Sequence, residues 1–184
     1  MATNKLEPTN VLTIYGRSVP NITLVVTDKY HNILDMSCIS RYAKDYTVRN
    51  NVLKQCIALI KNYDINTILL EQNKLMIDTF SKYPDPYILS NIILNFGINI
   101  TIQDAFYNTV KYILEIPHKD WTQQILNRNT RYSIDLFKSH VQNYSLSEET
   151  LNKIDNNNYY ECVCFSESVL YDCLMNKKYQ INKE

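Results

Sequence analysis

The sequence has very few glycines, no long apolar run and no excess of either charge. With two glycines in 184 residues, the chain lacks the glycine-rich loops that bind phosphate in P-loop and dinucleotide-binding proteins. No apolar run approaches the roughly 20 residues of a membrane-spanning helix, and no signal peptide is recognisable. The 19 basic residues balance the 19 acidic ones, so binding to nucleic acid or to a membrane would need a local patch.

The cysteines do not form the pattern of a secreted protein. They are five in number, an odd count that argues against a disulfide framework. We therefore expect an intracellular protein, cytoplasmic or nuclear, without a membrane association. The bias toward Asn, Ile, Lys and Tyr is typical of A/T-rich genomes, including those of some large DNA viruses, for which the compartment would be a viral factory.

The length predicts one folded domain, because two domains would each be near the lower limit for a stable core. We expect this domain to span residues 11–176, between a polar leader at 1–10 and a polar tail at 177–184. Three β-branched segments predict an antiparallel meander at residues 11–15, 22–27 and 33–39.

The remaining pattern predicts alternating helices and strands. Apolar spacings of three and four after Asp45 predict a helix, with Thr47 as its N-cap. Gly97 is expected to stop a later, proline-interrupted helix. The other predicted elements are strands at 66–70 and 98–102, helices at 75–96, 105–115, around 132–141 and at 159–175, and a loop with a short helical piece at 145–158.

Glu71 is the best-placed catalytic-type residue. It follows three apolar residues, Ile68, Leu69 and Leu70, at the end of a predicted strand, and the carboxyl ends of strands are where α/β sheets place ligands and catalytic groups. The alternative is a charged residue at an exposed strand end.

The last helix offers a second candidate. Glu161 and Cys164 are one turn apart and share a face with Ser168, so docking of this face beside Glu71 would let two carboxylates hold a divalent cation. Alternatively, Glu161 is a solvated charge that suits the helix dipole, and the cysteines are structural. Cys162 and Cys164 lack zinc-ligand spacing.

Basic residues in the second half form the best candidate nucleic-acid patch. Aromatic residues that can stack on bases are interleaved with them, and acidic residues dilute them. The alternative is a solvated helical surface above buried aromatics. The basic residues are Lys111, Lys119, Arg128, Arg131 and Lys138, and the aromatic residues are Tyr112, Trp121 and Tyr132.

The order of the predicted elements and the segment Asn66-Thr67-Ile68-Leu69-Leu70-Glu71-Gln72 resemble the RuvC-like Holliday junction resolvases of the RNase H-like superfamily, above all the poxvirus type. Residues 131–141 resemble the basic helix of that family. The resemblance covers about residues 11–174. It implies an α/β fold with a mixed five-stranded sheet, three antiparallel strands followed by parallel strands, flanked by helices, and a homodimer.

The resemblance also implies a degenerate active site. The family uses an Asp on the first strand, a Glu at the position of Glu71 and two acids on the last helix, which together hold two Mg²⁺ ions for phosphodiester hydrolysis. Here Tyr15 takes the Asp position if the strands are aligned, or Ile14 if the glycine is aligned. Glu161 matches the first helical acid, whereas Cys164 takes the place of the second. Thiols and phenols are poor Mg²⁺ ligands.

These substitutions predict a pseudoenzyme without a metal cofactor, retained to bind structured or branched DNA or a protein partner. One alternative is an active Mg²⁺-dependent, structure-selective endonuclease that uses Glu71, Glu161 and either Asp104 or Asp172. Another is an interaction protein, viral or cellular, with an unrelated α/β fold.

Overall fold

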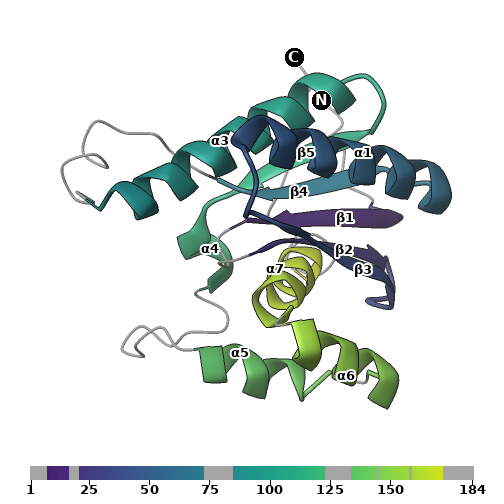
Figure 1. The fold of residues 1–184 in the computed structure, drawn as a ribbon. Helices are drawn as coiled ribbons and strands as arrows, with labels where there is room; N and C mark the ends of the chain where they lie inside the picture. Colours follow the sequence, from purple (N-terminus) through teal and green to yellow (C-terminus); the bar gives the residue numbers. More distant parts are fainter. Residues whose placement is uncertain are drawn as a thin grey trace.

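A mixed five-stranded sheet forms the centre of the protein, as a computed structural model shows (Figure 1). The structure describes residues 8–16, 21–72, 85–122, 134–144, 146–157 and 159–171. The strand order is β3-β2-β1-β4-β5, with β1 to β3 antiparallel and with β4 and β5 parallel to β1. The strands are β1 (Asn10–Tyr15), β2 (Asn21–Asp28), β3 (Ile33–Ser40), β4 (Thr67–Glu71) and β5 (Tyr112–Ile116).

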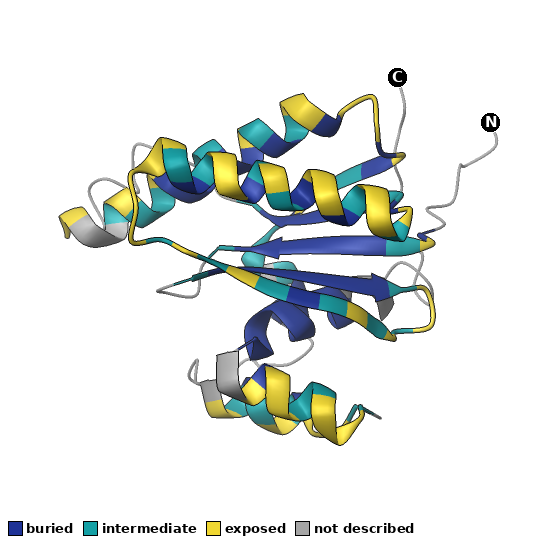
Figure 2. Cartoon of the chain, turned by 45° about the vertical axis from the view of Figure 1, so that its right-hand side comes forward, coloured by how far each residue is buried: buried dark blue, intermediate teal, exposed yellow. Residues whose placement is uncertain are grey.

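Helices cover both faces of the sheet (Figure 1). On one face lie α1 (Asp45–Tyr63) and α3 (Pro86–Phe106), and on the other lies α7 (Tyr160–Tyr171). The outer side of α7 packs against α5 (Ile134–Val141), and α6 (Glu148–Asn157) continues that layer. The described part of α7 is buried between the sheet and these two helices, as Figure 2 shows. The short α4 (His118–Thr122) follows β5.

Alternation along the strands divides the apolar core into two. Val11 and Tyr15 of β1 and Leu69 of β4 face α7, whereas Leu12 and Ile14 face α1 and α3. Strands covered on both faces read as continuous apolar runs, and β1 and β4 have such runs. Because Glu71 is two residues beyond Leu69, its side chain is on the α7 side of the sheet, as is that of Tyr15.

The first four strands are confirmed, but the predicted fifth strand is wrong. Residues 98–102 belong to α3, and the true fifth strand overlaps the end of the predicted helix at 105–115. Ile98 and Ile102 are four residues apart and both buried, whereas Ile100 is 44 % exposed, so helical packing overrides the alternation of β-branched residues. Gly97 does not end the helix, because it lies inside α3 beside the side chain of Arg49.

Other boundaries differ from the predictions more modestly. The N-cap of α1 is Lys44 rather than Thr47, which lies inside the first turn and donates its N–H to the Lys44 carbonyl at 2.8 Å. The segment predicted as mostly loop at 145–158 contains the ten-residue α6. The predicted leader and tail fall largely on residues 1–7 and 172–184, which are outside the described residues, so the domain limits stay a prediction.

Buried thiols should make the fold sensitive to alkaline pH. Burial raises the pKa of Cys56 from 9.0 to about 12, and burial also raises the pKa values of Cys162 and Cys164. The folded protein keeps these protons where the unfolded chain loses them, so this contribution to stability is present below pH 9.0 and is lost as pH rises toward about 12.

We therefore expect the free energy of unfolding, measured by urea titration, to fall as pH rises above about 9. Cys56→Ala should make the decline less steep by about 1.4 kcal/mol per pH unit, since one group fewer titrates. An unfolding free energy that does not change over this interval, or a slope that Cys56→Ala leaves unaltered, would contradict the assignment.

Candidate functional site

Glu71 ends β4 at the carboxyl edge of the parallel strands. In the register, Ile14 pairs with Leu70 and Glu71 pairs with Ile116, so the ends of β1 and β5 flank the carboxylate. Glu71 is only 5 % exposed, which rules out the alternative of an exposed strand end. A buried carboxylate needs charged or hydrogen-bonding partners.

The partners of the Glu71 carboxylate come from α4. His118 Nδ1 is hydrogen-bonded to Glu71 Oε1, and Trp121 donates its indole N–H to the same oxygen at 3.3 Å. Pro117 follows β5 directly and the helix begins at the next residue, so the parallel pairing of β5 with β4 delivers both side chains to the strand end.

An aromatic cluster fills the space in front of this carboxylate. Its members are fully buried and come from β1, α4, α5 and α7. The Trp121 ring centroid lies 5.9 Å from that of Tyr15, 5.8 Å from that of Phe137 and 5.2 Å from that of Phe165. Such tilted and edge-on contacts stabilise each pair by about 0.5–1.5 kcal/mol beyond burial. We call Tyr15, Trp121, Phe137 and Phe165 the aromatic cluster.

On the opposite side of the sheet, α3 fixes the backbone of the site. Asn99 donates from its amide nitrogen to the Glu71 carbonyl at 2.8 Å and to Glu115 Oε1 at 2.9 Å. One turn earlier, Asn95 Oδ1 accepts from Arg41 at 2.7 Å. A Cβ atom at Gly16 would overlap with that oxygen, so the glycine lets the end of β1 approach α3.

Glu161 lies in the first turn of α7 and is 6 % exposed. Phe165, one turn later on the same face, has its ring centroid 6.0 Å from that of Tyr15. Cys162 Sγ lies 3.9 Å from the Thr13 carbonyl and 3.8 Å from the Thr23 carbonyl. Because Thr23 pairs with Tyr15, α7 begins at the sheet edge that carries Glu71.

Cys164 faces away from this edge, toward α5. Its thiol donates to the Phe137 carbonyl at 3.8 Å and hydrogen-bonds the Tyr144 side chain. Burial raises the pKa of Cys164, which keeps the thiol neutral and makes it a poor nucleophile and metal ligand.

Two of the four positions that the resemblance assigns to metal ligands do not carry a carboxylate. Mg²⁺ prefers an octahedron of oxygen ligands, but Tyr15 is enclosed by apolar rings and Cys164 faces α5. Within the described residues, no three His, Cys, Asp or Glu side chains are grouped so that they could hold a metal ion. Of the alternative acids, Asp104 is exposed on α3 rather than at a strand end, and Asp172 lies outside the described residues.

The described members of the predicted basic patch lie on separate elements. Lys111 precedes β5 and Lys119 follows it, so five strand residues, about 16 Å, separate them. Lys138 lies on α5, with its Nζ 5.3 Å from the centroid of the Tyr160 ring. Arg128 and Arg131 are outside the described residues. A role for these residues in nucleic-acid binding stays a prediction.

The importance of His118 and Trp121 at Glu71 was not predicted. Trp121 was predicted only as a stacking group and His118 had no predicted role, because residues 112–115 were assigned to a helix. The apolar, β-branched run Tyr-Ile-Leu-Glu-Ile before Pro117 is the signal that would have placed both at a strand end beside Glu71.

Solved structures of Holliday junction resolvases are similar to this chain over nearly its whole length. A structure of Thermus thermophilus RuvC in complex with a Holliday junction substrate matches with a TM-score of 0.58 and 7 % identity, covering 94 % of this chain and 99 % of that one. A second Thermus thermophilus RuvC structure matches with the same score and identity, covering 94 % and 100 %. The yeast mitochondrial Holliday junction resolvase matches with a TM-score of 0.57 and 13 % identity, covering 96 % and 81 %.

No protein-family model and no curated protein matches the sequence. The fold is therefore RuvC-like, which confirms the predicted fold and excludes the alternative of an unrelated one. None of the described helices is long and apolar enough to cross a membrane.

Proposed function

We propose that this chain is a resolvase-like protein that binds structured DNA. It does not hold the metal ions that would be needed to cleave this DNA. The observation that carries the proposal is the hydrogen bonding of Glu71 Oε1 by both His118 and Trp121. Where the family has a carboxylate on β1, this chain has Tyr15 inside the aromatic cluster. This carboxylate is hydrogen-bonded by an imidazole and an indole and has a phenol beside it. Such an arrangement supports the proposal that the site holds no metal ions.

DNA binding is supported by the RuvC-like fold, since one similar RuvC structure contains a Holliday junction substrate.

A homodimer is supported by two exposed apolar side chains of α3. Ile93 and Ile100 are each 44 % exposed, and because they are seven residues apart they lie on the same side of the helix. A protein partner in place of DNA is the competing proposal, and it is favoured by the neutral net charge.

The test is the binding of a labelled four-way junction and of a linear duplex of equal length, measured by fluorescence anisotropy at increasing NaCl concentrations. We expect tighter binding of the junction, with affinity that falls as salt rises because bound counterions are released. Lys138→Ala should weaken binding and reduce the slope of log K against log[salt] by about 1. Lys61→Ala, at the end of α1, is the matched control.

The stoichiometry of the same titration tests the homodimer, which predicts two chains per junction. Equal affinity for junction and duplex would remove the structure-selective part of the proposal. Absence of binding at low salt would leave a protein partner as the function of this fold.

An active endonuclease is the second candidate. It is favoured by the burial of both Glu71 and Glu161 at one sheet edge, which retains two of the four acids that the family uses. Cleavage of the junction in the presence of Mg²⁺ or Mn²⁺ distinguishes the two candidates.

A further inference from the structure

A pocket of about 470 Å³ lies at the other end of the sheet from Glu71. It is bounded by the hairpin between β2 and β3, the segment between α5 and α6, and α7. Asn10, the first residue of β1, pairs with Asp28 at the start of this hairpin, whereas Glu71 is beside the last residue of β1. The pocket is therefore separate from the site at Glu71, and its volume suits a small organic molecule.

A carboxylate with one unused oxygen lines this pocket. Glu167 of α7 is 8 % exposed, and its Oε2 is paired with His31 Nδ1. Its other oxygen, Oε1, is buried and has no hydrogen-bond partner among the residues that the structure describes. Burial raises the pKa of Glu167, and the pairing with His31 acts against this rise. In its ionised form the carboxylate only accepts hydrogen bonds, so a ligand that meets this oxygen would have to offer an N–H or O–H donor.

The charges around Glu167 favour a cation as that donor. Asp28 acts on Glu167 electrostatically. Although burial acts to raise it, the pKa of Asp28 is lowered by hydrogen bonds from Asn32 and Tyr30, which keeps Asp28 ionised. His31 is paired with Glu167, and Lys29 lies beyond the rim with its Nζ 5.0 Å from the centroid of the Tyr30 ring.

Most of the other side chains that line the pocket are apolar or aromatic, and the polar ones are Asn32, Asn143 and Ser168. Ile33, Leu146 and Val163 contribute aliphatic surface. His140 and Tyr144 lie edge to face with their ring centroids 5.5 Å apart, and burial lowers the pKa of His140, which favours its neutral form. Aromatic faces bind organic cations through cation–π contacts, so Tyr144 and the neutral ring of His140 suit a cation on this side of the pocket.

We propose that this pocket binds a small organic cation whose amidinium, guanidinium or primary ammonium group donates to Glu167 Oε1. The aliphatic or aromatic body of the ligand lies against Leu146, Val163 and Tyr144. This site is independent of DNA binding and of the chemistry at Glu71.

The test titrates three cations, benzamidine, agmatine and phenethylamine, into the full-length protein and follows them by ligand-observed NMR, with benzoate as the anionic counterpart of benzamidine. At least one cation should bind at concentrations up to about 10 mM, and benzoate should not. Glu167→Gln keeps the shape of the side chain but removes its charge, and it should weaken binding by about 10- to 100-fold.

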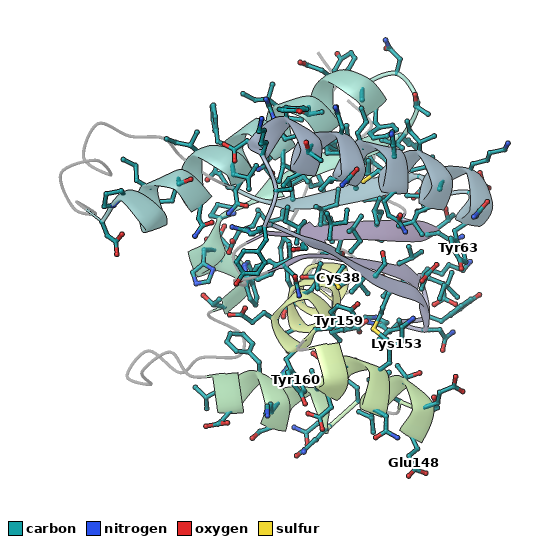
Figure 3. All side chains as sticks on the ribbon, in the orientation of Figure 1. Cys38, Tyr63, Glu148, Lys153, Tyr159 and Tyr160 are labelled. Atoms are coloured by element: carbon teal, nitrogen blue, oxygen red, sulfur yellow. The ribbon has the colours of Figure 1, made fainter. Side chains whose placement is uncertain are left out.

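Two further variants keep the test decisive if Glu167→Gln does not fold. Asn143→Trp places a large ring at the exposed mouth of the pocket and should also weaken binding. Glu148→Gln is the matched control, because Figure 3 shows Glu148 at the outer end of α6, pointing into solvent. Glu71→Gln should leave binding unchanged, which separates this proposal from the proposed function.

The proposal is overturned if none of the three cations binds, if benzoate binds as well as benzamidine, or if folded Glu167→Gln and Asn143→Trp both retain the wild-type affinity. Thermal unfolding of each variant establishes that it is folded before it is compared.

Discussion

Replacement of Trp121 by alanine is expected to lower the free energy of unfolding by about 3–5 kcal/mol. The indole is fully buried, and its ring contacts Tyr15, Phe137, Phe165 and His118. Truncation leaves a cavity where β1, α4, α5 and α7 meet. It also removes one of the donors to the buried carboxylate of Glu71.

Urea unfolding of the variant measures this loss. Tyr107→Ala is the matched control, because Tyr107 is 79 % exposed and its truncation should change stability by no more than about 0.5 kcal/mol. A loss below about 1 kcal/mol for Trp121→Ala would mean that the aromatic cluster does not hold the site together.

Replacement of Tyr15 by aspartate is expected to unfold the protein rather than restore a nuclease. The substitution removes a fully buried ring, at a cost of about 3–5 kcal/mol, and it places a second carboxylate next to Glu71 in apolar surroundings. The sum approaches the whole stability of a typical domain, about 5–15 kcal/mol. A metal ion would need further oxygen ligands to offset it.

Circular dichroism and urea unfolding, with and without Mn²⁺, measure the outcome for Tyr15→Asp. Tyr15→Phe is the control, because it retains the ring and should lose about 1 kcal/mol or less. A folded Tyr15→Asp variant that Mn²⁺ stabilises would show instead that the site can still be assembled from carboxylates, and it would favour the active-enzyme alternative.

The sequence predicts the first four strands because their signals are local. β1 and β4 are short apolar runs with β-branched residues, and the sheet buries both of their faces. The side chain of Cys38, on the edge strand β3, hydrogen-bonds that of Tyr159 just before α7, and Figure 3 labels both residues. No sequence pattern indicated that contact, because the two residues are far apart in the chain.

The fifth strand could not be assigned correctly from periodicity alone. Ile98, Ile100 and Ile102 alternate as a strand does, but contact of α3 with α1 selects the helical face that buries Ile98 and Ile102. The wrong assignment of the fifth strand also prevented prediction of the partners of Glu71. His118 is at a sheet edge only if residues 112–116 form β5.

The position of Glu71 was predicted from its own segment, whereas its partners were not. Alignment on the strand placed Tyr15 at the family's Asp position, and the structure puts the Tyr15 side chain on the same side of the sheet as Glu71. Ile14, the other alignment, faces α1 and α3. The direction of the Cys164 side chain could not be predicted, because it depends on the docking of α5 against α7. No local sequence pattern indicates that docking.

Whether the Glu71 site cleaves DNA is decided by incubating the purified protein with a labelled four-way junction, with and without Mg²⁺ or Mn²⁺. Wild type and Glu71→Gln are compared by denaturing gel, with an active resolvase as positive control. We expect no metal-dependent product from wild type beyond that from Glu71→Gln. Efficient cleavage by wild type that requires Mg²⁺ or Mn²⁺ and is abolished in Glu71→Gln would contradict this expectation.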